Sequence, residues 1–306
     1  MAGSFAAVDS GKCVARRARP MAQRVPWRDR SGRVSPLKIV ALAGSVAPAL
    51  WLGARGLLGD LGARPIHAAL LATGLWSVRF LLLSLVVTPA RLVFDAPRLT
   101  LIRRILGLAG AAYAIAHLAL YVADENLAWS FILHQMFGPF FLLIGTLSLI
   151  VLMALAATST DAALRRMGGL WRKLHRLAYP AIFLALWHFA LAQKLDVGPV
   201  VLPAGLFLWF MAWRLLPRAW QKRPDVLAAL AAVSAFATIG LEALWYKLAT
   251  GVPALLVLKG QFSLQAGLMP SWWVGLIGLG IALAVLLRSC FRAPTSRAPA
   301  VASDGN

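Results

Sequence analysis

Two histidines lie inside long apolar segments of the chain. His117 falls in LAGAAYAIAHLALYV, and His188 falls in YPAIFLALWHFAL. An imidazole surrounded by hydrocarbon is costly unless its ring nitrogens have partners, so each residue is a functional-site candidate. For either histidine alone, a hydrogen bond to a neighbouring helix explains its presence equally well. A pair that faces across two helices can instead bind one haem iron from both sides.

The composition is that of a membrane protein. Hydrophobic residues make up 60% of the chain, charged residues 14%, and the mean hydropathy is +0.74. A helix needs ~20 residues to cross a hydrocarbon core of ~30 Å. Membrane strands would instead alternate over ~10 residues, and the sequence has no such pattern. We therefore expect an all-α polytopic membrane helix bundle with eight spans, at about 38–58, 67–88, 101–122, 137–157, 175–193, 199–216, 226–248 and 270–288.

The basic residues predict the orientation. The net charge is +20, and the Lys and Arg residues gather in both terminal tails and in alternate loops, at 91–104, 165–176 and 214–223. The loops between them are poor in positive charge. This alternation predicts that both termini are cytoplasmic. The basic clusters are expected to touch anionic membrane lipid, and no nucleic-acid partner is implied.

The predicted orientation gives the two histidines the same depth. His117 and His188 each lie about 5 residues, or ~8 Å, from the outer end of a helix that runs outward. Equal depth on two helices suits one haem perpendicular to the membrane plane. Gly107 and Gly110 lie below His117 and would either leave room for the flat macrocycle or serve close helix packing, with equal weight given to each.

Two further residues are candidates for a site. His175 begins the fifth span on the cytoplasmic side, where it could be an inner haem ligand, a cofactor or quinone contact, or a plain interfacial residue. Arg103 and Arg104 would face an inner haem, and neither can bind iron. Arg79 lies ~15 Å deep, which is too far to reach water easily, so it is expected to contact a haem propionate, a quinone or flavin oxygen, or helix carbonyls.

The remaining polar residues are expected to have simpler roles. His67 and His134 should be solvated at the outer surface, and Glu242 should reach the outer interface. Cys13 and Cys290 fall in the tails, where disulfides are not expected. The sequence has no CxxCH motif, so haem would be held by coordination alone, as haem b, and no GxGxxG motif indicates an NAD(P)H module.

Three segments resemble a known family. GLWSVRFLLLSLVVTPARLV (74–93), RRILGLAGAAYAIAHLALYV (103–122) and ALAATSTDAALRRMGGLWRKLHRLAYPAIFLALWHF (154–189) are similar to the haem-binding membrane subunit of the bacterial periplasmic protein-methionine-sulfoxide reductase system. That subunit belongs to the ferric-reductase-like transmembrane superfamily, and the similarity covers about 38–216. It implies that His117, His175 and His188 are haem-associated. It also implies FMN, a donor that is either the quinone pool or a cytosolic flavin reductase, and a periplasmic molybdopterin-containing catalytic subunit as the electron acceptor.

These observations predict a b-type cytochrome with one haem or two in the bacterial inner membrane. It would be the electron-transfer subunit of an oxidoreductase complex rather than its catalytic subunit. We expect a basic cytoplasmic tail at 1–36, a haem-binding ferric-reductase-like domain at 37–216, a two-helix extension at 217–290 and a cytoplasmic tail at 291–306. The alternatives are a stand-alone ferric or quinone reductase and, from another class, a small-solute transporter. A transporter should show internal repeats or paired broken helices, and the sequence shows no convincing repeat.

Overall fold

The computed structural model describes residues 27, 33–193, 196–263 and 267–291, and regular structure within them is helical. Eight helical segments in this part of the chain are long and apolar enough to cross a membrane. Each predicted span corresponds to one of them, so the chain is a multi-pass helical membrane protein. The main helices are α1 (Pro36–Leu57), α2 (Pro65–Val93), α3 (Thr100–Asp124), α5 (Phe140–Ala157), α8 (Ala178–Gln193), α9 (Gly198–Leu215), α10 (Pro224–Thr250) and α12 (Pro270–Phe291).

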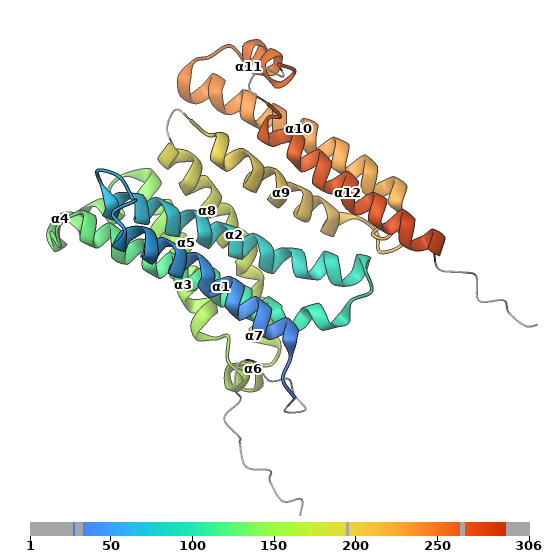
Figure 1. Cartoon of the computed structure of the whole chain (residues 1–306), viewed down its shortest axis with the longest axis horizontal. Helices are drawn as coiled ribbons and strands as arrows, with labels where there is room; N and C mark the ends of the chain where they lie inside the picture. Colours follow the sequence, from blue (N-terminus) through green and yellow to red (C-terminus); the bar gives the residue numbers. More distant parts are fainter. Residues whose placement is uncertain (1–26, 28–32, 194–195, 264–266, 292–306) are drawn as a thin grey trace, which may run out of the picture.

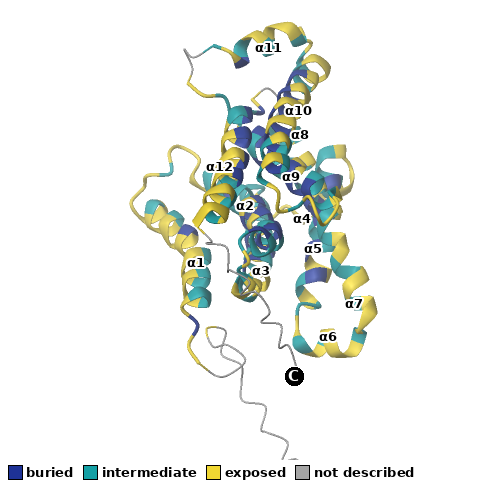
Figure 2. Ribbon diagram, turned by 90° about the vertical axis from the view of Figure 1, so that its right-hand side faces the viewer, coloured by how far each residue is buried: buried dark blue, intermediate teal, exposed yellow. Residues whose placement is uncertain are grey.

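Within the residues described above, six short helices lie between or beside the spans, and one of them, η2, forms the start of the expected fifth span at 175–193. They are η1 (Pro97–Leu99), α4 (Trp129–Phe137), α6 (Asp161–Met167), α7 (Gly169–Leu174), η2 (His175–Leu177) and α11 (Ala254–Gln261). The Thr160 hydroxyl caps α6 by accepting a hydrogen bond from the Ala163 amide at 3.0 Å. Helices α6 and α7 lie at the end of the bundle opposite α11 (Figures 1 and 2). We call the α6–α7 end the basic end, because Arg165, Arg166, Arg172 and Lys173 lie there.

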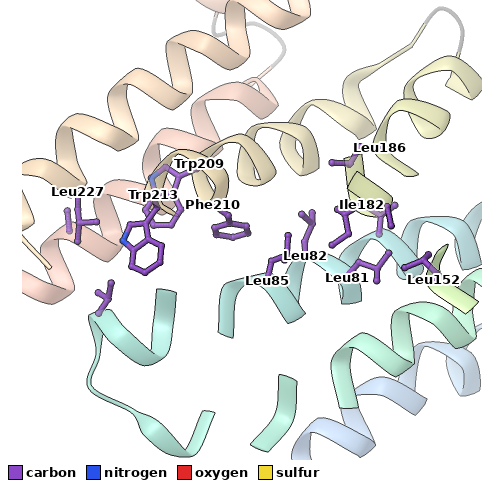
Figure 3. Close-up of a cluster of buried hydrophobic side chains, with 14 residues drawn as sticks. Leu81, Leu82, Leu85, Leu152, Ile182, Leu186, Trp209, Phe210, Trp213 and Leu227 are labelled. Carbon is purple, nitrogen blue, oxygen red and sulfur yellow. The ribbon is translucent and has the colours of Figure 1, made fainter. Parts of the chain in front are cut away.

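The helices form a layered bundle. Helices α10 and α12 flank one side, α1 and α3 the other, and α2, α8 and α9 lie between them (Figure 1). Helix α1 is largely exposed, as Figure 2 shows, whereas half of the apolar window of α2 is buried. Buried side chains from α2, α5, α8, α9, α10 and α12 form one continuous apolar cluster, whose members include Leu81, Leu152, Ile182, Phe210 and Leu227 (Figure 3).

A partly buried arginine of α9 compensates for a proline within α2. Pro89 has no amide hydrogen to donate to the carbonyl of Leu85, four residues earlier. The guanidinium of Arg214, on α9, donates to that carbonyl at 2.8 Å and to the carbonyl of Phe210 at 2.7 Å. Since no water is present in a hydrocarbon core to satisfy a freed carbonyl, this contact both preserves α2 and joins it to α9.

Small residues let the C-terminal helices pack closely. A Cβ atom added to Gly278, on α12, would lie 2.5 Å from the Cβ atom of Ala231, on α10. A Cβ atom added to Gly205, on α9, would lie 2.5 Å from a methyl group of Val274. Close approach at small residues is a principal source of helix association in membranes. The C-terminal helices are therefore joined to each other and to α9 by close packing against glycine positions.

We expect Gly278→Val to destabilise the bundle, because the added methyl groups must separate α10 from α12. Overpacking a tight contact costs about 1–3 kcal/mol. The matched control is Gly280→Val on the same helix, where an added Cβ meets nothing within 4 Å. Thermal unfolding of the purified variants, followed by size-exclusion chromatography, measures the difference. Equal melting temperatures for the two variants would contradict the packing described here.

Candidate functional site

The structure brings His117 and His188 together. His117 lies on α3 and His188 on α8, and their ring centroids are 6.3 Å apart, with an angle of 80° between the ring planes. Both residues lie in the second half of their helices, away from the basic end, where Arg104 of α3 is paired with Asp161 of α6. Each histidine is partly buried among apolar side chains.

The two rings are held in the same way. The Nδ1 atom of His117 hydrogen-bonds the carbonyl of Leu70 on α2 at 2.8 Å, and the Nδ1 atom of His188 hydrogen-bonds the carbonyl of Phe141 on α5 at 2.7 Å. A carbonyl can only accept, so each Nδ1 atom carries the hydrogen. This leaves the Nε2 atom of each ring with a lone pair, which is the form of imidazole that binds a metal.

Two glycines make these contacts possible. A Cβ atom on Gly74 would lie 2.9 Å from the Nδ1 atom of His117, and one on Gly145 would lie 2.8 Å from the Nδ1 atom of His188. Each glycine comes four residues after the carbonyl that its histidine bonds, so each ring lies directly against one turn of backbone. Any side chain at either position would displace the ring.

The correspondence between the two halves extends to other residues. Each histidine bonds a carbonyl 47 residues earlier in the chain. Ser77 donates to the carbonyl of Gly110, and Ser148 donates to the carbonyl of Ala181, both at 2.8 Å and both 33 residues later. These pairs of residues are related by a constant offset of 71 positions. The helix pair α2–α3 is therefore repeated as α5–α8, and the expectation that the chain has no internal repeat was wrong.

The separation of the rings suits a bound metal ion. A metal–imidazole bond is about 2 Å long, and an imidazole ring built from bonds of about 1.3–1.4 Å has a radius of about 1.2 Å. Two such bonds and two such radii laid end to end span about 6–6.5 Å, and the observed distance between the centroids is 6.3 Å. The Nδ1–H bonds to backbone carbonyls are the outer contacts that orient metal-binding histidines. The pair therefore fits an iron held between two imidazoles.

The glycines considered in the sequence analysis have a different role. Gly110 serves close packing, because an added Cβ would lie 2.7 Å from the side chain of Leu81 on α2. The alternative that Gly110 leaves room for a macrocycle is therefore wrong. Gly107 has open space beside it, with nothing within 4 Å of an added Cβ.

His175 lies apart from the pair. It begins η2 at the basic end, 13 residues before His188, which is about 20 Å along a helix. Its ring stacks on Trp171, and its two nitrogens contact the Trp171 carbonyl and the Ser159 hydroxyl. The residue that corresponds to His175 in the repeat is Arg104, which is exposed and paired with Asp161 at 3.0 Å. The repeat thus supplies two imidazoles at one end and one at the basic end.

Arg79 is not buried, contrary to expectation. Its guanidinium lies on the outward face of α2, 4.7 Å from the centroid of the Trp76 ring. The expectation that it needs an anion inside the bundle rested on depth alone, and depth does not determine which way a helical residue points. Its contact with a propionate, quinone or flavin oxygen stays a prediction.

Two residues assigned to the outer surface also differ from expectation. Glu242 is buried rather than interfacial, and its carboxylate accepts a hydrogen bond from Gln261 at 3.1 Å. His67 is paired with Asp124 at 2.9 Å instead of being simply solvated, whereas His134 is exposed as expected. Cys290 is exposed at the end of α12, and Cys13 lies outside the described residues. Among the described residues, no three His, Cys, Asp or Glu side chains cluster as metal ligands.

Four residues of the site were not predicted, although the sequence carries a signal for them: Gly74, Gly145, Ser77 and Ser148. The pattern G-x-x-S-x-x-x-L occurs at 74–81 and again at 145–152, and a histidine follows each at the same distance. The pattern is easily missed because few other positions in the two helix pairs are identical.

The fold and the site define a class: a multi-pass membrane protein whose repeated helix pairs present two opposed imidazoles to one site. Comparison with known proteins refines this class. Residues 69–186, which include Gly74, His117 and Gly145, match the family of the ferric-reductase-like transmembrane component. No solved structure matches the chain significantly.

The chain matches most of the length of each of three curated relatives. The protein-methionine-sulfoxide reductase heme-binding subunit MsrQ of Rhodospirillum rubrum is 37% identical over 198 residues, which are 64% of this chain and 93% of that protein. MsrQ of Caulobacter vibrioides is 39% identical over 183 residues, 58% of this chain and 83% of that protein. MsrQ of Brucella anthropi is 38% identical over 181 residues, which are 58% of this chain and 81% of that protein. The chain belongs to the MsrQ family.

Proposed function

We propose that this chain is the haem-binding electron-transfer subunit of a protein-methionine-sulfoxide reductase, with His117 and His188 as the axial ligands of a haem b. The observation that carries the proposal is the histidine pair, with ring centroids 6.3 Å apart and both Nδ1 atoms bonded to backbone carbonyls. The names of the curated relatives, which say that those proteins are haem-binding subunits of such a reductase, give it further support.

Each part of the site would have a distinct role. Bound haem supplies one-electron redox chemistry, which no side chain of this chain provides. His117 and His188 would hold it from both sides, while the carbonyls of Leu70 and Phe141 fix the tautomer and raise the basicity of the ligating nitrogens. The surrounding apolar helices would exclude water and so influence the reduction potential.

The direction of electron flow follows from the proposed topology. We propose that the basic end faces the cytoplasm and that the protein lies in the bacterial inner membrane, which puts the histidine pair nearer the periplasm. A periplasmic molybdopterin-containing catalytic subunit would be the acceptor, and quinol or a cytosolic flavin reductase would be the donor. FMN and a cofactor contact by His175 or Arg79 enter this proposal by resemblance, as does the domain division at residues 37–216 and 217–290.

The transporter alternative has less support. A parallel repeat would also suit a transporter, but such proteins usually break helices at the midplane where the solute binds. Helices α2, α3 and α5 run without interruption through that depth, and so does α8 beside His188. An optical spectrum of the purified protein tests the choice directly: a Soret band with reduced α and β bands supports the proposal, and a colourless protein sinks it. A stand-alone ferric or quinone reductase would have the same spectrum and would be distinguished by activity without the catalytic subunit.

We expect His117→Ala and His188→Ala each to remove most of the bound haem, because the iron loses one of its two axial imidazoles. His175→Ala, about 20 Å away along the helix, should retain this haem and slow the entry of electrons. Haem content at matched expression, measured by the pyridine haemochromogen assay, checks both statements. Wild-type haem content in both alanine variants would rule out the axial assignment.

Gly74→Ala and Gly145→Ala should also lower haem content, although neither glycine can bind iron. The added methyl group would displace the neighbouring imidazole from its carbonyl, and we expect at least a several-fold loss or a shifted Soret band. Gly107→Ala is the matched control, since its added methyl group has open space. If all three variants had the same spectrum and haem content, the proposed role of Gly74 and Gly145 in positioning the imidazoles would be incorrect.

Reporter fusions test the orientation. A reporter fused after Asn306, which lies outside the described residues, or within 158–174 should behave as cytoplasmic, and one within 123–136 as periplasmic. The physical basis is charge: five basic residues lie in or beside the first loop (Arg165, Arg166, Arg172, Lys173 and Arg176), whereas the second has none and holds Asp124 and Glu125. A periplasmic signal from the 158–174 fusion would place the histidine pair near the cytoplasm and refute delivery of electrons to a periplasmic partner.

A further inference from the structure

An apolar groove of about 370 Å³ lies between α8, α9 and α10. This volume is within the range of about 300–1,000 Å³ that is typical of ligand sites. Phe183 of α8 and Leu241 of α10, at its rim, are 50% and 51% exposed, and both belong to segments that span the membrane. The groove therefore opens to lipid, and whatever fills it must come from the membrane.

The groove is elongated along α9. Its wall on that helix is a stripe that runs from Val200 to Met211, with Ala204 and Leu208 at successive turns between them. This stripe is ~16 Å long at 1.5 Å per residue, which is about half of a hydrocarbon core of ~30 Å. The groove thus matches one leaflet in length, and that is the dimension of a lipid acyl chain rather than of a compact solute.

One end of the groove carries an acidic group. Among the described residues that line the groove, Glu242 alone is ionisable. A Cβ atom added to Gly205 of α9 would lie 2.6 Å from the hydroxyl oxygen of Thr238 on α10, so these two residues lie at the same level. Glu242 is four residues from that level in the direction of α11, and Met211 is six residues from it in the opposite direction. The carboxyl group therefore lies ~15 Å from the other end of the groove along the helix axes.

The protein uses only half of the Glu242 carboxyl group. Gln261 of α11 donates to its Oε2 atom at 3.1 Å, and Ser271 of α12 donates to the oxygen of the same Gln261 amide, which fixes the direction of that amide. In the part of the chain that the structure describes, the Oε1 atom of Glu242 has no hydrogen-bond partner, and protein atoms do not enclose it completely. An isolated carboxylate in hydrocarbon is far more costly than the neutral acid. In the neutral acid, Oε2 is the carbonyl oxygen that Gln261 bonds, and Oε1 carries a hydrogen to donate.

We propose that the groove binds one acyl chain of a glycerophospholipid and that neutral Glu242 donates a hydrogen bond to the ester carbonyl of that chain. The ester carbonyl lies at the head of an acyl chain, and Glu242 lies towards the corresponding end of the groove. Apolar neighbours such as Val201 and Leu241 suit an ester better than a phosphate or an ammonium group. The hydrogen bond provides the specificity, because lipid tails are as apolar as the lining and gain little by exchanging one apolar contact for another.

The bound lipid has a structural role in this proposal. It fills the space between α8, which carries His188, and α10 of the C-terminal helices. It therefore supports α8 on the side away from α5, whose Phe141 carbonyl holds His188. The proposal concerns lipid alone and does not depend on haem.

The test compares two phospholipids that differ in the ester carbonyl. Purified full-length protein is delipidated and given equal amounts of dioleoyl phosphatidylcholine and its dialkyl ether analogue, and native mass spectrometry counts the lipid that stays bound. The ester lipid should be retained about three- to tenfold more than the ether lipid, which is the effect of one hydrogen bond. Equal retention of the two lipids overturns the proposal.

Substitutions locate the site. Glu242→Gln keeps one donor and one acceptor and should preserve the preference for the ester lipid, whereas Glu242→Leu should remove it. Ala204→Phe fills the groove and should abolish retention of the ester lipid. Leu283→Phe, on an exposed position of α12 that does not line the groove, is the matched control and should change nothing. Loss of the preference in Glu242→Gln, or equal retention by Ala204→Phe and the control, contradicts the proposed site.

Chemical labelling of the wild-type protein makes the test independent of how well the variants fold. Dicyclohexylcarbodiimide, an apolar reagent that reacts with neutral carboxyl groups in membranes, should modify Glu242. The ester phospholipid should slow this reaction several-fold more than the ether analogue, and peptide mass spectrometry locates the label. Glu242 that stays unmodified in delipidated protein, or that reacts at equal rates with either lipid present, overturns the proposal. Protection by decylubiquinone but not by phospholipid would assign the groove to a different ligand and overturn it as well.

Discussion

The hydrogen bond from each imidazole to a helix carbonyl is the contact on which the site depends. A neutral histidine in hydrocarbon has two nitrogens to satisfy, and only one of them can be left for a metal. Bonding Nδ1 to a backbone carbonyl solves this without a second polar side chain. Both carbonyls lie within helices, and that of Leu70 also accepts a hydrogen bond from the Thr73 hydroxyl at 2.9 Å, so each imidazole bonds a carbonyl that is already in use. This bond also requires the imidazole to touch the backbone, which explains why Gly74 and Gly145 stand where they do.

The repeat explains why the two histidines meet. Helices α2 and α5 run away from the side of the histidine pair and α3 and α8 run towards it, so the two pairs are related by an axis along the membrane normal rather than in its plane. Equivalent residues near such an axis face one another. A planar macrocycle with two chemically similar faces suits this arrangement better than an asymmetric solute would. At the basic end the equivalence is broken, because Arg104 occupies the position that corresponds to His175.

The sequence predicted the helices and the pairing of the histidines well, since both follow from strong one-dimensional signals. Twenty apolar residues in a row specify a membrane helix whatever surrounds them, and positive charge at alternate ends gave the relative depth of His117 and His188. The sequence did not predict how each helix is rotated about its own axis, and so which residues face the interior of the bundle. Arg79 proved to be exposed and Gly110 proved to be a packing contact, because the faces of a uniformly apolar helix cannot be told apart by hydropathy.

Contacts between polar residues far apart in the sequence could not be predicted either. Glu242 looked interfacial because it lies near the end of its span, yet it is buried and accepts a hydrogen bond from Gln261 of α11, to which Ser271 of α12 donates in turn. The same limit applies to Arg214 on α9. Its side chain donates to the Leu85 carbonyl of α2, which Pro89 cannot do because it has no amide hydrogen. In each case a polar group survives in the bundle because a distant segment supplies its partner, and only the folded chain brings the two together.

The C-terminal helices can be understood in the same physical terms. About a third of the chain lies outside the match to the Rhodospirillum rubrum relative. If α10 and α12 only shielded α9 from lipid, apolar side chains would suffice, because lipid and leucine are equally apolar. Burying a carboxyl group there is costly, even when it is hydrogen-bonded to an amide that a hydroxyl group bonds in turn. Glu242 and the two residues that follow it in this chain of hydrogen bonds therefore join α10, α11 and α12 by a polar contact inside the bundle, which apolar packing alone would not provide.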